Sequence, residues 1–146
     1  MAFEFKLVRR VEFSETDMAG IVHYSNFFRY AEAAESAFFR SLGLSIRPPQ
    51  AAQEVGWPRV HAECDYAQPL RFEDEIEIHL LVAEKSARKF VYQFRIRKLN
   101  AQPPVEVARG KIIAVCVKQD GPHHMKVAQI PADIAEKIEV APKELL

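Results

Sequence analysis

The sequence predicts an α+β fold in which one long helix lies against an antiparallel sheet. Apolar residues recur with a period of 3.6 in a single long segment, from about Tyr24 to Leu42, and with a period of two in five other segments. The links between the later strand-like segments are short, as in antiparallel arrangements. The 146 residues are expected to form one domain, 1–146, and 49% of them are apolar, which is enough to bury a core.

The N-terminal part is expected to hold one strand, one turn and the helix. The strand runs roughly from Phe3 to Phe13, where apolar and charged residues alternate. The polar run from Ser14 to Asp17 ends it, and Gly20 follows, which suits a tight turn because glycine adopts positive φ without steric cost. Gly43 lies just past the helix, where a C-terminal cap is expected. The helix stripe expected to face the core consists of Phe27, Tyr30, Ala31, Ala34, Phe38, Ser41 and Leu42.

Four strands are expected after a proline-containing connector, Arg47 to Pro58. Their alternating apolar positions are Val60, Ala62, Cys64 and Tyr66; Ile76, Ile78, Leu80 and Val82; Phe90, Tyr92, Phe94 and Ile96; and the segment Val105–Val117, which becomes apolar on both faces as a central strand does. The links Gln68–Leu70, Lys85–Lys89 and Asn100–Pro104 are short enough for antiparallel hairpins. The tail from Pro131 to Leu146 predicts a short helix. Because one helix covers only one face of such a sheet, we expect a homodimer or homotetramer.

Composition excludes several classes of function. Lys plus Arg and Asp plus Glu balance at 20 each, so the charge predicts neither nucleic-acid binding nor membrane binding. The N-terminus lacks the apolar core of a signal peptide, and no stretch reaches the roughly 18 apolar residues of a membrane span. Cys64 and Cys116 fall within strand patterns and are expected to be small buried residues. The adjacent His123 and His124 make a poor chelate, so we expect no metal, no cofactor and a cytoplasmic location.

The stretch from Glu15 to Phe27 carries the candidate chemistry. It places Asp17 in a loop, then Gly20 for a turn, then a helix start at Tyr24. The first N–H groups of a helix lack partners inside the helix and can hold a carbonyl oxygen as negative charge develops on it. A nearby carboxylate can attack that carbonyl or activate a water, which is sufficient to hydrolyse an acyl group with a thiolate leaving group. By spacing alone, a turn or capping role is the commoner explanation of such an aspartate.

The run Asp17-Met18-Ala19-Gly20-Ile21-Val22-His23-Tyr24-Ser25-Asn26-Phe27 closely resembles the signature of the 4-hydroxybenzoyl-CoA thioesterase family of hotdog proteins, which includes the acyl-CoA thioesterases associated with the Tol–Pal system. The family pattern is approximately Asp-x-x-Gly-(Ile/Val)-Val-x-(Tyr/His)-x-Asn-(Tyr/Phe). The resemblance covers nearly the whole chain, through Arg29, Tyr30 and Glu32 to Asp65-Tyr66 and Pro69-Leu70. It implies a hotdog fold, in which an antiparallel sheet wraps a long central helix. It also implies hydrolysis of an acyl-CoA substrate at sites formed between subunits.

The resemblance implies a role for each matching residue. Asp17 matches the catalytic carboxylate, described as a nucleophile or as a general base in different members of the family. Tyr24 matches the residue at the helix start whose backbone N–H polarises the thioester carbonyl, and Asn26 matches a polar residue that holds the Asp17 loop. Gly20 matches the turn glycine. His23 departs from relatives that carry Tyr or Trp, and it is either a half-buried substitute for an aromatic ring or a proton-transfer residue.

Coenzyme A carries phosphates, so its binding predicts local positive charge. Lys85, Arg88 and Lys89 cluster around one expected hairpin. In the family, basic residues near this hairpin contact the nucleotide end, which makes Arg88 and Lys89 candidate substrate-binding residues; a solvated turn is the alternative. Glu32 and Glu35 flank the helix stripe and are expected to be surface residues. Outward-facing strand positions are expected for Arg59, Arg95, Arg97 and Arg109.

Two other functions fit the same pattern. A hydroxyacyl-thioester dehydratase needs a histidine and an acidic residue that cooperate across a dimer, but the acidic position here lies in the short loop before the helix, which favours hydrolysis. A non-catalytic acyl-CoA-binding protein would use Asp17 only to shape the loop. Replacement of Asp17 by Asn separates these functions, because it removes turnover only if the chain is the hydrolase.

Overall fold

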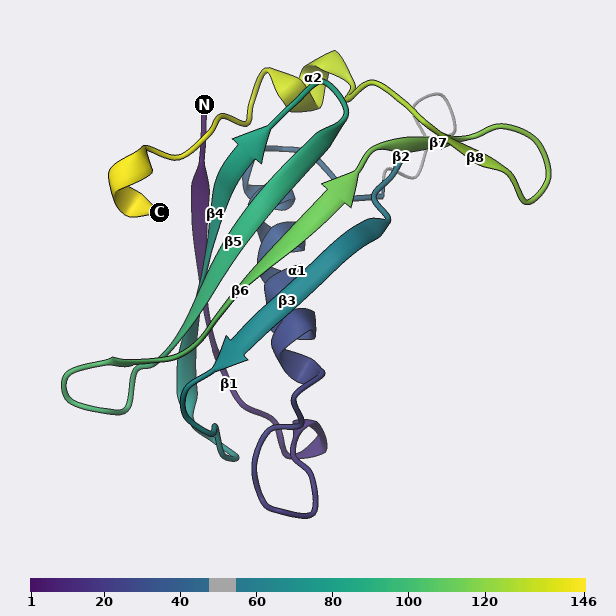
Figure 1. The fold of residues 1–146 in the computed structure, drawn as a ribbon. Helices are drawn as coiled ribbons and strands as arrows, with labels where there is room; N and C mark the ends of the chain where they lie inside the picture. Colours follow the sequence, from purple (N-terminus) through teal and green to yellow (C-terminus); the bar gives the residue numbers. More distant parts are fainter. Residues whose placement is uncertain (48–54) are drawn as a thin grey trace.

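Five main strands and one long helix form the body of the chain in the computed structural model, which describes residues 1–47 and 55–146 (Figure 1). Most of the expected connector from Arg47 to Pro58 lies outside the described residues. The elements in chain order are β1 (Glu4–Arg10), the short 3-10 turn η1 (Phe13–Glu15), α1 (Asn26–Ser41), β2 (Val55–Gly56), β3 (Arg59–Tyr66), β4 (Glu75–Lys85), β5 (Lys89–Lys98), β6 (Val105–Val115), β7 (Val117–Gln119), β8 (Met125–Val127), α2 (Ala132–Ala135) and η3 (Lys143–Leu145).

The main sheet is antiparallel and has the strand order β1-β4-β5-β6-β3. It curves around α1, which packs against a single face of it (Figure 1). The α+β class and the single long helix are therefore confirmed. The first strand is shorter than expected, and the expected segment Val105–Val117 is divided between β6 and β7, the second of which joins a small sheet of order β2-β7-β8.

Two of the three expected hairpins are confirmed and one is wrong. The links at Lys85–Lys89 and Asn100–Pro104 join β4 to β5 and β5 to β6, which pair directly. The link at Gln68–Leu70 closes no hairpin, because β3 pairs with β6 and β4 pairs with β1. The reason is the anchoring of this link: Leu70 is fully buried, and its carbonyl accepts the N–H of Val22 at 2.8 Å, so the segment crosses the end of the sheet instead of turning back.

The helix α1 buries most of its expected stripe. Phe27, Tyr30, Ala31, Ala34 and Phe38 are buried against the sheet. Ser41 was expected on this face but is exposed, because the helix ends there. Gly43 has a φ of 73° and closes the C-terminus as predicted, with its N–H bonded to the carbonyl of Arg40.

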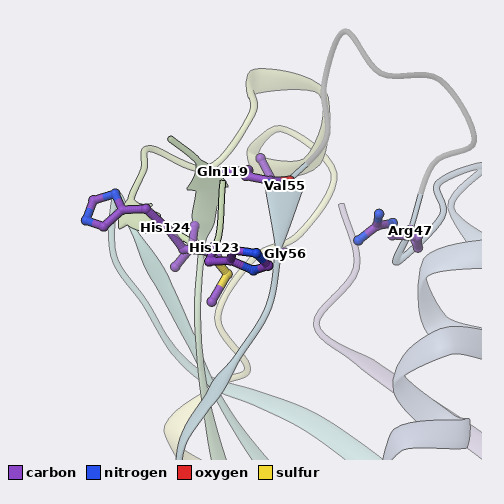
Figure 2. A pocket seen from close by; sticks show the side chains of 8 residues that line it. Arg47, Val55, Gly56, Gln119, His123 and His124 are labelled. Atoms are coloured by element: carbon purple, nitrogen blue, oxygen red, sulfur yellow. The ribbon is translucent and has the colours of Figure 1, made fainter. Parts of the chain in front are cut away.

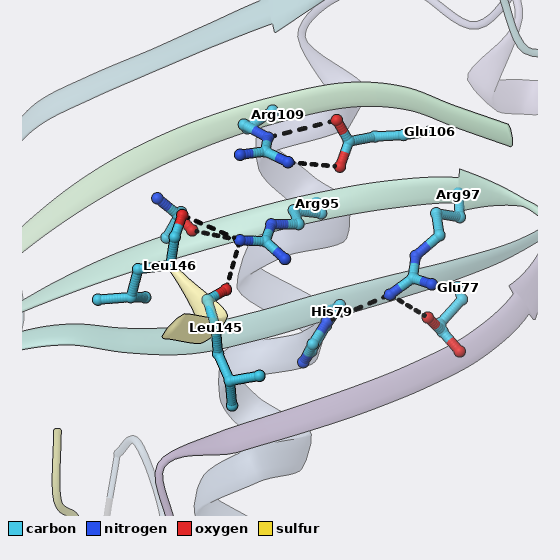
Figure 3. A network of polar contacts seen from close by, with 9 residues as sticks. Glu77, His79, Arg95, Arg97, Glu106, Arg109, Leu145 and Leu146 are labelled. Atoms are coloured by element: carbon cyan, nitrogen blue, oxygen red, sulfur yellow. Dashed lines mark hydrogen bonds and ion pairs between the residues drawn. The ribbon is translucent and has the colours of Figure 1, made fainter. Parts of the chain in front are cut away.

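The sheet face that points away from α1 carries a network of charged residues (Figure 3). Arg95 donates to the carbonyl of Leu145, and Arg97 pairs with Glu77 at 3.5 Å and also contacts His79. The outward positions expected for Arg95, Arg97 and Arg109 are thus consistent with this network. Both cysteines are free, and Cys116 is buried as expected, although it lies between β6 and β7. Cys64 of β3 is only half-buried, so the expectation of a buried residue is wrong there. In the part of the chain that is described, no helix is long and apolar enough to cross a membrane.

Candidate active site

Asp17 lies in a tight loop that joins η1 to α1. An isolated bridge between Thr16 and Val22 closes the loop, and the N–H of Asp17 donates to the carbonyl of Ile21 at 2.8 Å. Gly20 has a φ of 81°, and its N–H donates to the carbonyl of Asp17 at 3.0 Å. The glycine therefore supplies the left-handed backbone that the turn requires, as predicted. The Asp17 carboxylate is half-buried, and only one of its oxygens accepts a bond from the loop, from the N–H of Ala19 at 2.8 Å.

The backbone N–H of Tyr24, in the turn before α1, donates to no acceptor among the described residues. The neighbouring amides are all used: the N–H of Val22 donates to Leu70, that of His23 to Glu15 and that of Asn26 to His23. Within residues 1–47 and 55–146, the Tyr24 amide has no acceptor. The helix begins at Asn26 rather than at Tyr24, so the free donor belongs to the turn before the helix, close to the positive end of its dipole.

Asp17 and Tyr24 line the same surface pocket, which has a volume of about 460 Å³. Its other lining residues come from the loop before α1, from the first turn of α1 and from the end of β3 with the link that follows it. They are Ile21, Val22, Phe27, Tyr66, Ala67, Gln68 and Pro69. The pocket therefore brings a carboxylate residue and the residue with the unbonded amide to one largely apolar hollow, and a carboxylate and an amide donor are the groups that acyl transfer requires.

Tyr66 is a pocket residue that the sequence did not single out for a role. Its hydroxyl donates to the carbonyl of Tyr24 at 3.0 Å, and its ring meets that of Phe27 edge-on at 4.9 Å. Burial raises the pKa of Tyr66 to about 12, so the hydroxyl remains a donor at neutral pH. Tyr66 thus fixes the peptide that follows the free amide. In the sequence, the family resemblance included Asp65-Tyr66 at the end of an alternating strand, but it gave Tyr66 no role.

Asn26 bonds to the segment that leads into the Asp17 loop. Its side-chain N–H donates to the carbonyl of Glu15 at 2.8 Å, and the residue is buried. Glu15 itself was not predicted as a site residue. Its carboxylate accepts bonds from Arg9 at 2.7 Å and from the hydroxyl of Tyr30 at 2.9 Å. These contacts join β1, the Asp17 loop and α1.

His23 lies on the exposed rim of the site and is absent from the pocket wall. Its ring stacks on that of Tyr24 with centroids 4.6 Å apart, and its Nδ1 lies 2.8 Å from the hydroxyl of Ser25. The expectation of a half-buried ring is therefore wrong for a single chain, because the turn before α1 directs the imidazole outward. Its stacking favours a role as an aromatic neighbour of Tyr24 over proton transfer.

The basic hairpin lies at the opposite end of the chain from Asp17 (Figure 1). Arg88 is exposed and Lys89 is half-buried, whereas the ammonium group of Lys85 donates to the carbonyls of Ala135 and Ile138 at 2.6 and 2.8 Å. Lys85 is thereby committed to the fold, which leaves Arg88 and Lys89 as the cations of this hairpin. A hollow of about 460 Å³ adjoins the hairpin and is lined in part by Ser86.

Glu35 and Arg59 differ from the expectation of surface positions. Glu35 is 2% exposed, and both of its carboxylate oxygens accept bonds from the guanidinium of Arg59, one of them at 3.1 Å. Burial raises the pKa of Glu35, while the Arg59 guanidinium acts in the opposite direction. Arg59 therefore points toward α1 rather than outward. Glu32 is exposed, as expected.

His123 and His124 border a separate hollow beside the small sheet (Figure 2). Their two rings point in different directions there, and His123 has a φ of 58°. Among the described residues, no group of three or more His, Cys, Asp and Glu side chains is arranged to hold a metal ion. None of the described residues that line this hollow also lines the Asp17 pocket.

The chain is similar to known thioesterases along most of its length. The sequence model of the Thioesterase-like superfamily matches residues 11–138. A putative esterase of Aquifex aeolicus is 35% identical over 130 residues, which are 88% of this chain and 92% of that protein. The 4-hydroxybenzoyl-CoA thioesterase of Pseudomonas sp. (strain CBS-3) is 29% identical over 142 residues, which are 93% of this chain and 98% of that protein.

Solved structures show the same arrangement of helix and sheet. A 1,4-dihydroxy-2-naphthoyl-CoA thioesterase from Synechocystis superposes with a TM-score of 0.81 at 25% identity and covers 92% of this chain and 94% of its own. A D17N mutant of 4-hydroxybenzoyl CoA thioesterase, complexed with 4-hydroxybenzoyl CoA, superposes with a TM-score of 0.80 at 26% identity and covers 92% of this chain and 98% of its own.

Proposed function

The chain belongs to the thioesterase-like superfamily, and from this membership we propose that it hydrolyses an acyl-CoA thioester to the free acid and CoA with Asp17 as the catalytic carboxylate. The fold is the hotdog fold, and the enzyme is an acyl-CoA thioesterase. One observation carries the assignment of the site: the pocket is lined by the half-buried Asp17 and by Tyr24, whose backbone amide has no acceptor among the described residues. The alternative reaction, dehydration, needs a histidine at the site, and among the described residues of one chain no histidine lines that pocket.

The proposed reaction uses the amide and the carboxylate in turn. The thioester carbonyl oxygen accepts the N–H of Tyr24, which stabilises the negative charge that forms on the oxygen in the tetrahedral intermediate. Asp17 either attacks the carbonyl carbon to give an acyl-enzyme anhydride or removes a proton from the water that attacks it. In both routes the C–S bond breaks, CoA leaves as the thiolate, and one water is consumed. The thiolate is a good enough leaving group to need no dedicated acid.

The surrounding residues are assigned to orientation. Gly20 gives the loop its turn, Asn26 fixes the loop to α1, and Tyr66 holds the peptide after the free amide. We assign His23 to the rim, where it packs on Tyr24. These assignments follow from hydrogen bonds and stacking in a single chain, and they leave Asp17 and the Tyr24 amide as the groups that touch the reacting atoms.

We infer an aromatic acyl group as the substrate class. The relatives named above are thioesterases of 4-hydroxybenzoyl-CoA and 1,4-dihydroxy-2-naphthoyl-CoA. The rings of Phe27 and Tyr66 form the wall next to Asp17, and aromatic rings pack well edge-on or offset against such a wall. Aliphatic acyl chains would bury similar area but would lack this ring-to-ring geometry.

We propose that two copies pair along β3. This strand is at the end of the main sheet, and its apolar Val60 is 64% exposed. Antiparallel pairing of β3 with its copy turns the partner end over end. The partner's 85–89 hairpin then comes to the same end of the assembly as Asp17, which is why Arg88 and Lys89 remain candidates for the CoA phosphates despite their distance from Asp17 within one chain.

Thiol release from a panel of aromatic and aliphatic acyl-CoAs tests the function. We expect the wild type to release CoA fastest from aromatic substrates, and Asp17→Asn to lose at least a hundredfold in kcat while still binding substrate. Asp120→Asn, which alters an exposed aspartate in the turn between β7 and β8, is the matched control and should behave as wild type. Equal turnover by wild type and Asp17→Asn would exclude Asp17 from the chemistry, and no turnover with any substrate would exclude the proposed reaction.

A further inference from the structure

We infer that Glu15 is a positioning residue that fixes the Asp17 carboxylate relative to the backbone amide of Tyr24. The inference deepens the proposed function and rests on it. Glu15 lies outside the pocket wall and touches neither reacting group, so it acts through the groups that it holds. It precedes Asp17 by two residues and bonds to the residue immediately before Tyr24.

The carboxylate of Glu15 is fixed from three directions. Oε2 accepts a bond from Arg9 Nη2 of β1 at 2.7 Å, and Oε1 accepts the hydroxyl of Tyr30 of α1 at 2.9 Å and the N–H of Glu12 at 2.8 Å. The guanidinium of Arg9 also lies over the Tyr30 ring, 4.8 Å from its centroid. The Glu15 side chain is 15% exposed, so solvent competes little with these bonds. A side chain held by a strand and a helix leaves its own backbone little freedom.

The backbone carbonyl of Glu15 holds the turn that carries Tyr24. It accepts the N–H of His23 at 2.9 Å and the side-chain N–H of Asn26 at 2.8 Å. The first bond fixes the residue whose successor, Tyr24, presents the free amide. The second bond ties the same carbonyl to the first residue of α1. One residue thus sets both sides of the pocket: the chain leading to Asp17 and the turn that carries the Tyr24 N–H.

The anchoring donor stays protonated over the pH range of an assay. Burial, together with the hydrogen bond to Glu15, raises the pKa of the Tyr30 hydroxyl well above its usual value. Tyr30 therefore remains a donor to Glu15 at neutral and mildly alkaline pH. A displacement of about 1 Å between reacting groups can lower a rate about a hundredfold. Loss of this anchor should accordingly lower the rate of the chemical step more than the affinity for substrate.

Steady-state kinetics of Glu15→Ala, Glu15→Gln and Tyr30→Phe test the inference. We expect Glu15→Ala to lower kcat about 10–100-fold with KM changed less than about threefold. Glu15→Gln keeps an oxygen acceptor for Tyr30 and Glu12 but loses the ion pair with Arg9, so it should recover part of the rate. Tyr30→Phe should lower kcat by a smaller factor and serves if Glu15→Ala does not fold. Glu106→Ala, an exposed carboxylate that pairs with Arg109 at 3.1 Å on the outer sheet face, is the matched control and should leave kcat unchanged.

The double variant Glu15→Ala/Asp17→Asn separates positioning from a general loss of stability. If Glu15 acts through Asp17, adding Glu15→Ala to Asp17→Asn lowers kcat little further, because the effects of groups that act as a unit are not additive. Full multiplication of the two effects, or a Glu15→Ala loss that appears in KM alone, would overturn the inference. The Asp17→Asn variant tests the proposed function by itself. If Asp17→Asn is inactive while Glu15→Ala and Tyr30→Phe keep a normal kcat, only the role of Glu15 is refuted.

Discussion

Glu35 of α1 and Arg59 of β3 form a buried ion pair that links the helix to the edge strand. Glu35 is nearly fully buried, whereas the side chain of Arg59 is 28% exposed. The hydroxyl of Tyr92 is fully buried beside this pair and has no hydrogen-bond partner among the described residues. Burial and the adjacent Glu35 raise the pKa of Tyr92 well above its usual value. Arg59 is therefore the main group that compensates the charge of the carboxylate.

Removal of Arg59 should destabilise the protein in a pH-dependent way. We expect Arg59→Met to lower the free energy of unfolding by about 3 kcal/mol at pH 8, where Glu35 is left ionised without its partner. The loss should be smaller at pH 5. The pKa of Glu35 is raised in the folded state, and more so without Arg59, so the folded variant binds more protons than the unfolded chain and loses stability as pH rises through this window. Urea unfolding at the two pH values measures the difference.

The control for this prediction is Glu35→Gln/Arg59→Met, whose loss of stability should not vary with pH, because it carries no buried carboxylate. An equal loss in Arg59→Met at pH 5 and pH 8 would contradict the assignment of the effect to Glu35. Both chains keep the apolar packing of the methionine side chain, so the comparison isolates the charge.

The site was predictable from sequence where the contacts are local. Asp17, Gly20 and Tyr24 lie within one stretch of eight residues, and all three match the family pattern. The link from Tyr66 to Tyr24 spans 42 residues and that from Glu35 to Arg59 spans 24, and alternation along a strand cannot reveal either partner. Arg59 was placed on the wrong side because the pairing of β3 with β6 shifts register between Arg59 and His61, which breaks the simple alternation.

At the scale of elements, β5, β6 and β3 are packed closely at Gly110. A Cβ at this position of β6 would lie closer to the ring of Phe94 and to the backbone carbonyl of Glu63 than carbon atoms can approach. The carbonyl belongs to β3, which forms the edge of the sheet and lies next to the pocket. Glycine is therefore required here for strand contact rather than for an unusual backbone conformation.

We expect Gly110→Ala to lower the free energy of unfolding by about 2 kcal/mol, because the added methyl group forces β3 or the Phe94 ring to move. Chemical denaturation of wild type and variant measures this. Lys111→Ala, which truncates the exposed neighbour on the same strand, is the control and should change stability by less than about 0.5 kcal/mol. A Gly110→Ala protein as stable as the wild type would show that the sheet yields at this point.

Local hairpins between elements were predictable, but the pairing of distant strands was not. The turns of β4 with β5 and of β5 with β6 follow from short links between alternating segments. The pairing of β1 with β4 and of β3 with β6 joins segments separated by the helix or by two other strands, and their alternating patterns match several partners equally well. The link after β3 helps to select the observed pairing, because Leu70 is buried and its carbonyl accepts the N–H of Val22 in the turn before α1.

At the scale of the whole molecule, β3 leaves one side of the main sheet open. Only β6 pairs with it within the described chain, and its apolar Val60 is largely exposed. Exposed edge strands usually carry charge, proline or a bulge along their length, because an open edge recruits another strand. The bulge of β3 contains Val60, and the strand also carries Glu63 and Asp65, so the proposed pairing with its copy runs along the residues after the bulge.

The proposed pairing along β3 predicts that a charge at Val60 separates the subunits and lowers turnover. A two-fold axis places each Glu of Val60→Glu against the partner strand, in place of an exposed apolar side chain, so burial of the carboxylates opposes association. We expect sedimentation analysis to give a dimer or tetramer for the wild type and a monomer for Val60→Glu. The monomer should also lose substrate affinity, since Arg88 and Lys89 of the partner subunit would no longer lie at the Asp17 end. Val127→Glu is matched in side chain and exposure, 53% against 64%, but lies in β8 away from this edge, and it should remain oligomeric. An oligomer of unchanged mass in Val60→Glu would move the interface to another surface.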